Sequence, residues 1–522
     1  MAFRLDEVGG FARLAFGLRR FLADRIPIDD AAAVVRANVA TREGRFLAML
    51  RSAVFGHEPS PYRTLCRWAG LELGDIAGLV RSDGLEGTLA RLHGAGVHVE
   101  WEELKGRKPI VRGSQTMQAP WHSFDNPLAR SDFAGSTGGS SGRSLRVAVD
   151  LENDAESAPD WALVFAAHGW QASPLIFWTP NHVGVASRFL KCSKFGKDMA
   201  RWFVMARMTD RGERLRSAVI HRLVRSVAGY PRPVAAPLDR AERVLDDLYG
   251  WLDRGSRPVV NTSPSAAALL SGLAVARGRP LAGVSFLLGA EPLTAARHQA
   301  IVAGGGLPVA TYGTSEGGWI GAQFPGARQP DEVHLFKDAY AVITAAAGPT
   351  TGGTGLPLWF TNLRRASPKV LLNAAIGDSA VLEVDATDPQ GSAFGYDTRL
   401  HTIRSFRKVT LWGTTFAVAD LEGLVEAWLP EHFGGSHRQW QLWETEDGRG
   451  RPELRLLADP SLGPLDERAV GEALLAELAR RGRSYGFMAD ELRSTGSLKV
   501  ERRCPKLTGR GKLLPVLTQR AS

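Results

Sequence analysis

Short apolar runs alternate with helical patterns through the middle of this chain. Five apolar runs predict buried strands, at residues 175–178, 202–206, 258–260, 284–288 and 309–312. Helical patterns lie between several of them, at residues 240–252, 265–277 and 295–303. Such alternation is typical of an α/β fold, with a mostly parallel sheet and helices on its faces. Ligands bind such sheets at the carboxyl ends of the strands, so the loops that follow the strands are the first candidates for function.

The two ends of the chain differ from its middle in their pattern of hydrophobic and polar residues. Residues 1–30 predict an arginine-rich amphipathic helix docked on its own domain, and residues 30–110 are mostly helical in pattern. After about residue 405, strands are predicted at residues 409–412, 438–445, 453–457 and 497–502, with a helix at residues 466–481. We therefore expect a large N-terminal domain over residues 1–404, helical over about 1–120, and a small α+β domain over residues 405–522.

Composition narrows the classes of function. The chain has 522 residues, 44% of them hydrophobic, and a formal net charge of +9. This modest basic excess suits anionic ligands such as nucleotides or coenzyme A, whereas the scattered basic residues do not favour nucleic acid. Cys66, Cys192 and Cys504 form no CxxC pair, so we expect no zinc ribbon and a reducing, cytoplasmic location. No apolar run reaches the roughly 18–20 residues of a membrane span.

A run of small and polar residues at positions 136–144 is the first candidate for chemistry. Glycines let backbone N–H groups converge on an anion, hydroxyls add donors, and a following arginine suits phosphate. Two other interpretations remain open, a flexible linker and the GxSxG elbow of a hydrolase, although the residues before it make a poor strand. The predicted phosphate-binding residues are Thr137, Gly138, Gly139, Ser140, Ser141, Gly142 and Arg143.

Two further loops follow predicted strands directly. The strand at residues 284–288 runs into Gly289, Ala290 and Glu291. About twenty residues later, the strand at residues 309–312 runs into a second polar, glycine-rich loop. An aromatic side chain, hydroxyls and one carboxylate are the groups needed to stack a base and hold a magnesium ion. The residues concerned are Tyr312, Gly313, Thr314, Ser315 and Glu316.

With these loops the sequence resembles the adenylate-forming enzymes, which include acyl-CoA synthetases, nonribosomal-peptide adenylation domains and luciferases. It is most similar to their branch of phenylacetate–CoA ligases, coenzyme F390 synthetases and capsule-biosynthesis ligases. Four more matches follow in the family's order and extend the resemblance over roughly residues 130–515. They are Gly377-Asp378, Arg404 nine residues before Gly413, the acidic stretch 420–422, and the loop 505–512 that ends in Lys512.

The resemblance implies an ATP- and Mg²⁺-dependent ligase that joins a carboxylic acid to AMP and releases pyrophosphate. In that scheme Gly289, Ala290 and Glu291 line the adenine, Tyr312 stacks near it, and Asp378 holds the ribose hydroxyls with Arg404 nearby. Glu316 would ligate magnesium, and Lys512 would bridge the substrate carboxylate and the α-phosphate. The resemblance places the acyl pocket at four residues, which are Trp178, His182, Phe286 and Trp319.

The acceptor of the acyl group is less constrained. The resemblance implies the thiol of CoA or of a carrier-protein phosphopantetheine, reached after the small domain rotates. The position two residues after Arg404, where relatives carry an acidic or lysine hinge, is Phe406 here. This departure leaves two alternatives open: transfer to an amine or hydroxyl, or a non-catalytic binding protein of the same fold.

Overall fold

A helical layer opens the large domain. The computed structural model describes residues 17–129, 133–137, 145–180, 183–205, 231–314, 316–344, 355–507 and 513–518. Residues 17–23 are helical, whereas the first part of the helix predicted at residues 1–30 lies outside the described residues. The helices of this layer are α2 (Ile28–Ala40), α3 (Arg42–Met49), the π-helical turn Leu50–Phe55, α4 (Pro61–Trp68), α5 (Leu73–Gly94) and α6 (Trp101–Leu104).

Two short hairpins follow this layer. They are β1 (Ile110–Arg112) with β2 (Gln115–Met117), and β3 (Phe133–Thr137) with β4 (Leu145–Val149). Single helical turns occur at Trp121–Phe124, Leu238–Arg240, Ser392–Phe394 and Pro460–Leu462.

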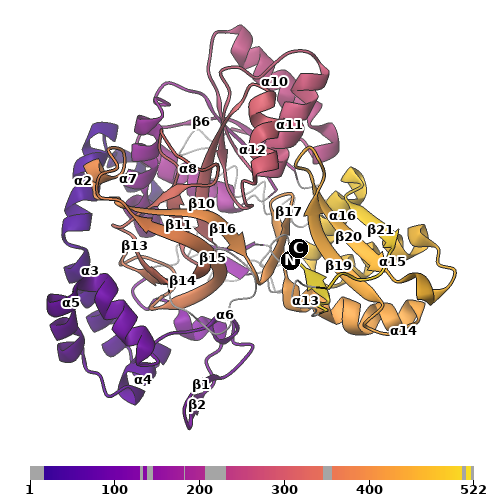
Figure 1. Ribbon diagram of the computed structural model, residues 1–522. Helices are drawn as coiled ribbons and strands as arrows, with labels where there is room; N and C mark the ends of the chain where they lie inside the picture. Colours follow the sequence, from indigo (N-terminus) through magenta and orange to yellow (C-terminus); the bar gives the residue numbers. More distant parts are fainter. Residues whose placement is uncertain are drawn as a thin grey trace, which may run out of the picture.

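One half of the central sheet is parallel, as the sequence predicts. In spatial order its strands are β10 (Leu307–Thr314), β9 (Ser285–Leu288), β8 (Val259–Thr262), β5 (Leu175–Thr179), β6 (Met199–Val204) and β7 (Pro233–Ala235). The helices connected with them are α7 (Leu151–Ala167), α8 (Val183–Lys194), α10 (Glu242–Asp253), α11 (Pro264–Ala276) and α12 (Ala295–Ala303). Figure 1 shows α10, α11 and α12 together beside this half of the sheet.

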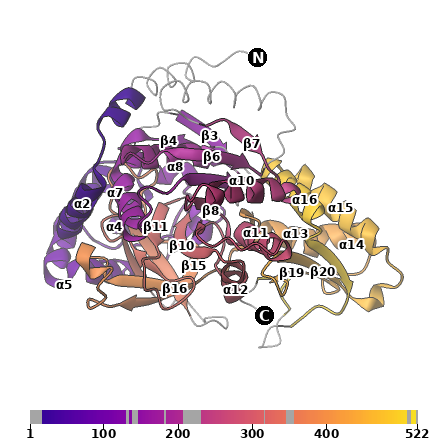
Figure 2. The ribbon, with the colours of Figure 1, turned by 90° about the horizontal axis from the view of Figure 1, so that it is seen from above.

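The other half of the sheet is antiparallel, so the central sheet as a whole is mixed. From β10 outward it comprises β11 (Gly318–Ala322), β12 (Val333–Leu335), β16 (Thr398–Ser405), β15 (Ala374–Val384), β14 (Leu356–Asn362) and β13 (Tyr340–Thr344). Runs of consecutive buried residues in β12, β14 and β15 remove the alternation by which an antiparallel strand is recognised. In Figure 2 the helices α2, α4 and α5 lie along this side of the molecule.

The C-terminal residues form the predicted α+β unit. The hairpin of β17 (Lys408–Leu411) and β18 (Thr414–Ala417) leads into α13 (Val418–Gly423), the π-helical turn Leu424–Trp428 and α14 (Leu429–Phe433). The remaining elements are β19 (Trp440–Glu446), β20 (Pro452–Ala458), α15 (Glu467–Arg480), α16 (Arg483–Thr495), β21 (Leu498–Arg502) and β22 (Val516–Leu517). The sheet has the order β21-β20-β19-β22. The elements that the sequence did not predict are β18, α13, the π-helical turn, α14, α16 and β22. The pattern of α16 follows that of α15 after a single break at Gly482.

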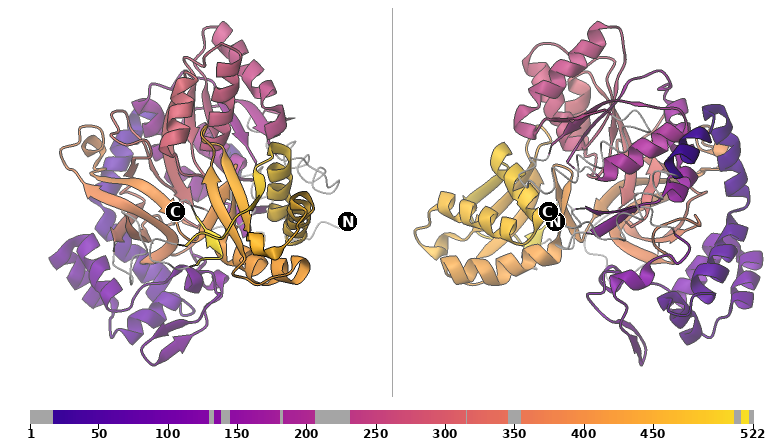
Figure 3. Two further views of the ribbon diagram at one scale, coloured as in Figure 1. Left: turned by 45° about the vertical axis from the view of Figure 1, so that its right-hand side comes forward. Right: turned by 180° about the vertical axis from the view of Figure 1, so that it is seen from behind.

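The small domain lies beside the large one (Figure 3), and β17 lies between them (Figure 1). The tip of this hairpin, at Trp412 and Gly413, has positive φ at both residues, 53° and 77°. A β-carbon at Gly413 would lie 3.5 Å from Ser263 Cβ and 3.6 Å from Pro180 Cγ. The tip therefore contacts the large domain where β5 and β8 end. Among the described helices, none is long and apolar enough to cross a membrane.

Candidate functional site at the strand ends

Tyr312 and Asp378 meet in the centre of the molecule. Tyr312 lies on β10 and Asp378 on β15, and the tyrosine hydroxyl donates to Asp378 Oδ2 at 2.8 Å. Both residues are buried, with 8% and 6% of their surface exposed. Burial raises the pKa of Tyr312 well above its usual value, and the nearby carboxylates of Asp378 and Glu316 raise that pKa further. Three residues that the sequence analysis assigned to nucleotide and metal therefore converge.

Glu316 begins the turn between β10 and β11 and is almost completely buried, with 1% of its surface exposed. Its Oε1 atom accepts a hydrogen bond from Lys105 Nζ at 2.5 Å. Burial alone would raise the pKa of Glu316, but the positive charges of Lys105 and Lys408 lower that pKa to about 2. The carboxylate is therefore charged at neutral pH and neutralised by a lysine from the helical layer.

This carboxylate fits a magnesium site in which the protein supplies only one ligand. Mg²⁺ is commonly held by one or two carboxylates together with substrate phosphates and water. Among the described residues no group of three His, Cys, Asp or Glu side chains could hold a metal by itself. Glu316 would thus supply one protein ligand, and the nucleotide would supply the others. Its oxygen Oε1 is bonded to Lys105 in this conformation.

The loop after β10 is shaped by close backbone approaches. The pairing of β10 with β11 shifts register between Tyr312 and Gly313. A β-carbon at Gly313 would lie 2.7 Å from the Gly318 carbonyl oxygen, so only glycine fits there without movement. Thr314 Oγ1 accepts from the Gly317 N–H at 3.0 Å and closes the turn. These contacts place Glu316 directly after the strand that carries Tyr312.

Arg404 lies on β16, the neighbour of the strand that carries Asp378. Arg404 lies opposite Ser379 in the strand pair. The Nη1 atom of Arg404 lies 2.8 Å from Asp331 Oδ2. Asp331 also accepts the backbone N–H groups of Thr402 and Ile403, at 3.0 and 3.1 Å. The arginine is therefore held beside the Asp378 strand by a carboxylate that the sequence analysis did not identify.

The segment after Arg404, for which the resemblance implies a hinge, is hydrogen-bonded to the same strand. The Phe406 N–H donates to the Gly377 carbonyl oxygen at 3.1 Å, and Ser405 Oγ donates to it at 3.3 Å. Gly377 has a φ of 84°, and a β-carbon there would lie 3.0 Å from Arg407 Cβ. Glycine at this position therefore lets the Asp378 strand and the hinge pack closely.

Residues Gly289, Ala290 and Glu291 form the turn after β9, at the same edge of the sheet. A β-carbon at Gly289 would lie 2.7 Å from Thr311 Oγ1, which explains the glycine. Glu291 accepts from the Ser265 N–H at 3.2 Å and from Ser265 Oγ at 2.9 Å. It also accepts the N–H of Gly413, at the tip of the small-domain hairpin. Glu291 thus joins the two domains, and its predicted contact with adenine stays a prediction.

The predicted acyl-pocket residues lie in different surroundings. Trp178 and Phe286 are fully buried, and Trp178 Nε1 donates to the Ala236 carbonyl oxygen at 2.7 Å. Trp319 is partly buried and stacks on Trp161, with ring centroids 3.7 Å apart. Protein atoms cover the first two side chains in this conformation, so their part in an acyl pocket stays a prediction.

Several predicted residues lie outside the part of the chain that the structure describes. Thr137 is the last residue of β3, which places the glycine-rich segment between β3 and β4. The residues outside the described ranges are Gly138, Gly139, Ser140, Ser141, Gly142, Arg143, His182, Ser315 and Lys512.

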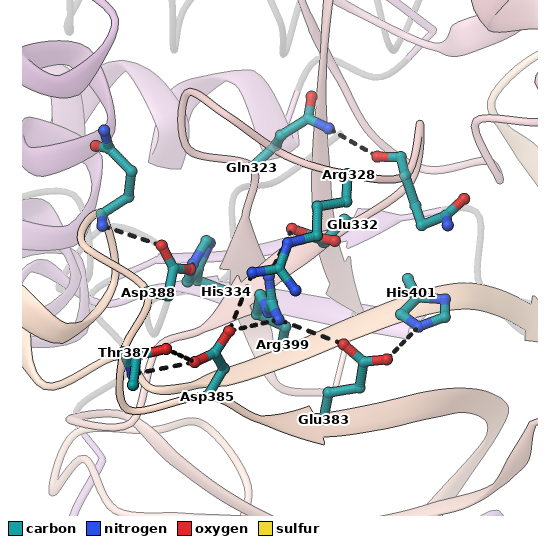
Figure 4. Close-up of polar contacts among 12 residues, drawn as sticks. Gln323, Arg328, Glu332, His334, Glu383, Asp385, Thr387, Asp388, Arg399 and His401 are labelled. Atoms are coloured by element: carbon teal, nitrogen blue, oxygen red, sulfur yellow. Dashed lines mark hydrogen bonds and ion pairs between the residues drawn. The ribbon is translucent and has the colours of Figure 1, made fainter.

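A second polar cluster lies at the other end of the β15–β16 pair (Figure 4). Arg399 is 3% exposed and pairs with Asp385 at 3.0 Å, Glu383 at 3.4 Å and Glu332 at 3.7 Å. His334 Nε2 bonds Asp388 Oδ2 at 2.5 Å beside them. Because its charges satisfy one another, this cluster fixes the β15–β16 turn and is not a candidate for catalysis.

Lys105 and Asp331 are the site residues that the sequence analysis missed. Lys105 opens a basic turn, residues 105–108, that looked like an ordinary helix end. Nothing in its local pattern indicates a carboxylate 211 positions later.

Comparison by sequence identifies no relative: no family model matches the chain, and no curated protein gives a significant match. Comparison of structures does give matches. An amide bond synthetase, Mcba, from Marinactinospora thermotolerans is 12% identical with a TM-score of 0.42, and the match covers 92% of this chain and 97% of that chain. The anthranilate CoA ligase AuaEII is 12% identical with a TM-score of 0.36, over 82% of this chain and 74% of that one. An acyl-CoA synthetase (AMP-forming)/AMP-acid ligase II-like protein from Dyadobacter fermentans is 15% identical with a TM-score of 0.29, over 73% and 87%.

Proposed function

We propose that this protein is an ATP-dependent, AMP-forming ligase that activates a carboxylic acid as an acyl-adenylate. The observation that carries the proposal is the convergence of Tyr312, Asp378 and Glu316. The tyrosine and the aspartate are joined at 2.8 Å, and both carboxylates raise the pKa of that tyrosine. These are the residues to which the sequence resemblance assigns adenine, ribose and metal, although 66 positions separate Tyr312 from Asp378.

The chemistry requires two anions to meet. A carboxylate oxygen attacks the α-phosphorus of ATP, the bond to the β-phosphate oxygen breaks, and pyrophosphate leaves. In our proposal Tyr312 and Asp378 orient the nucleoside, while the glycine-rich segment ending at Arg143 binds the leaving phosphates. Glu316 would hold the Mg²⁺ ion, which when bound offsets phosphate charge. Lys512 would neutralise the substrate carboxylate as it approaches the α-phosphate.

We further propose that the acyl group passes to a thiol, of CoA or of a carrier-protein phosphopantetheine. The thiolate would attack the acyl carbon, and the bond to the AMP oxygen would break. The support is the place of the β17–β18 hairpin, whose tip at Gly413 contacts the ends of β5 and β8. An acceptor approaching the strand ends would pass this hairpin, so the small domain is in position to define its route.

Pyrophosphate exchange into ATP tests the first half-reaction. Pools of aryl, fatty and amino acids are supplied with Mg²⁺, and we expect exchange that depends on one pool. Lys512→Ala should nearly abolish exchange while circular dichroism stays unchanged. Full exchange by that variant would remove Lys512 from the mechanism.

The acceptor is tested on the pool that responds. CoA, a phosphopantetheinylated carrier protein, amines and alcohols are added in turn, and products are identified by mass. A thioester would support the proposed acceptor, whereas an amide or ester would replace it. Nucleotide binding without exchange for any acid would favour a non-catalytic binding protein.

A further inference from the structure

The pair of Lys105 and Glu316 is more deeply buried than most ion pairs among the described residues. The two side chains are 3% and 1% exposed, and Nζ lies 2.5 Å from Oε1. Lys105 follows α6 in the helical layer, whereas Glu316 follows β10 in the centre of the sheet. The contact therefore places a helical-layer cation on the carboxylate that we assign to magnesium.

Aromatic rings hold this ammonium in place. Lys105 Nζ lies 4.5 Å from the ring centroid of Trp101 and 4.1 Å from that of Trp121. Electron-rich ring faces stabilise a cation that has lost its water, and the interaction strengthens where solvent is excluded. Lys105 is thus held by two rings and one carboxylate, although burial lowers its pKa.

Two more lysines contact the same rings, but their contacts differ. Lys369 Nζ lies 3.9 Å from the Trp121 centroid and pairs with Asp125. Lys408 Nζ lies 4.6 Å from the Trp101 centroid and comes from the first residue of β17. Lys105, in contrast, makes its ion pair with Glu316.

An ammonium and a divalent ion on the same carboxylate oxygen repel each other, and Lys105 Nζ already lies 2.5 Å from Glu316 Oε1. We propose that Lys105 is a resident counter-ion of Glu316, and that Mg²⁺ reaches this oxygen only after the lysine side chain has moved away. Lys105 is then a positioning residue that weakens metal binding until the nucleotide brings its own negative charge. The inference rests on the proposed function, since it takes Glu316 as the metal ligand.

The surroundings of Lys105 permit such a movement and connect it with the small domain. The side chain is a flexible four-carbon stem, and it follows the last residue of a single-turn helix. In the same basic turn, Arg107 Nη2 lies 3.7 Å from Asp420 Oδ1 on α13. A change in the position of the small domain would therefore alter the contact of Arg107, which is two residues from Lys105.

The test measures how strongly the metal assists nucleotide binding, without any turnover. Full-length protein is titrated calorimetrically with an ATP analogue that has a methylene bridge between the α- and β-phosphorus. The dissociation constant in EDTA is divided by that in Mg²⁺. Lys105→Met keeps the length of the side chain and removes its charge, so we expect this ratio to rise about tenfold, equivalent to about 1.4 kcal/mol.

Two further variants define the effect. Lys194→Met is the matched control, because Lys194 is also buried, pairs with Asp24 at 3.1 Å and lies over the Phe21 ring; its ratio should equal that of the wild type. In the double variant Lys105→Met, Glu316→Gln, the rise in this ratio should disappear, because the carboxylate that would bind the metal has been removed.

Lys105→Arg keeps the experiment decisive if the methionine variant does not fold. A guanidinium can hold the carboxylate with two N–H donors, so the ratio should fall below that of the wild type. An unchanged ratio in folded Lys105→Met, or in Lys105→Arg, would overturn the inference while leaving nucleotide binding intact. Absence of nucleotide binding by the wild type would instead overturn the proposed function, and this inference with it.

Discussion

Two buried glutamates lie at the ends of neighbouring parallel strands but have different partners. Glu316 follows β10 and is neutralised by Lys105, which belongs to the large domain's helical layer. Glu291 follows β9 and accepts hydrogen bonds from Ser265 and from Gly413 of the small domain. The resemblance seen in the sequence assigned Glu291 to the adenine and Glu316 to magnesium, and both residues follow a predicted strand.

The difference shows that position at a strand end is not enough to assign a role. Glu291 also pairs with Arg297 Nη1 at 3.3 Å, and Arg297 Nε donates to the Gly450 carbonyl oxygen at 3.1 Å. Thr294 Oγ1 donates to Glu446 Oε2 at 2.9 Å in the same contact. Glu291 thus belongs to an interdomain network, whereas the Glu316 pair lies within one domain.

Arg297→Ala should have the largest effect on stability. It would leave the Glu291 charge buried without its cation, a loss that typically costs about 3–5 kcal/mol. Urea unfolding measures it, with Arg365→Ala as the control, because Arg365 pairs with Glu152 at the surface. Equal stability of the two variants would mean that the interdomain network contributes little.

Glu316→Gln should lower activity strongly. It removes the proposed metal ligand, and we expect acid-dependent pyrophosphate exchange to fall about 100-fold. Glu332→Gln is the matched control: Glu332 is buried to a similar degree, but its partner Arg399 lies in the structural cluster of Figure 4. A similar loss in both variants would point to general destabilisation.

Glu291→Gln should instead loosen the contact between the domains. A hydrogen bond to a charged acceptor contributes about 1.5–3 kcal/mol, so the open population should rise at least about tenfold. Trypsin cleavage at Arg407 and Lys408, where the small domain begins, reports that population. If Glu291 lines adenine instead, cleavage would stay constant and the KM for ATP would rise.

The stability of the Lys105→Met variant, relative to that of the wild type, should depend on pH. Without Lys105, burial still raises the pKa of Glu316, while the charge of Lys408 still lowers it. Because burial has the larger effect of the two, we expect the pKa of Glu316 in this variant to lie above the usual 4.5. Between 4.5 and the raised pKa, the folded variant binds a proton that the unfolded chain does not, so its stability increases as the pH falls. In the wild type the pKa of about 2 keeps Glu316 charged throughout this window.

The stability gap between wild type and Lys105→Met should therefore narrow as the pH is lowered from 7.5 to 5. The narrowing should be about 1.4 kcal/mol for each pH unit below the raised pKa. Urea unfolding at several pH values measures it. A gap that is constant with pH would mean that Lys105 does not set the charge of Glu316.

Gly413→Ala should have the smallest effect. The φ of 77° disfavours alanine by about 1 kcal/mol, while the added β-carbon would make only ordinary contacts at 3.5–3.7 Å. Gly423→Ala, in α13 with no atom within 4 Å of the added carbon, is the control and should be neutral or stabilising. A large loss at Gly413 would show that the hairpin tip is packed more tightly than this geometry implies.

The sequence predicted the elements in regions where strands and helices alternate, or where an element is separated clearly from its neighbours. The strands that became β5, β8, β9 and β10, and helix α15, have clear boundaries. The antiparallel strands β12, β14 and β15 were missed because runs of consecutive buried positions hide their period.

In the candidate site, the order of the motifs was enough to predict that Tyr312 and Asp378 lie close together, and the two side chains are hydrogen-bonded. Lys105 could not be predicted, because a basic turn after a helix usually faces water and its partner is 211 positions away. The interdomain role of Glu291 depends on how two domains dock, which local pattern does not encode.

The most direct test of acyl-adenylate formation follows one oxygen atom. A carboxylic acid of the responding pool is labelled with ¹⁸O in its carboxylate and turned over with ATP and acceptor, and the AMP is analysed by mass. If the carboxylate oxygen attacks the α-phosphorus, each AMP released by acyl transfer carries one ¹⁸O atom from the acid. Unlabelled AMP, or label in inorganic phosphate with formation of ADP, would contradict the account.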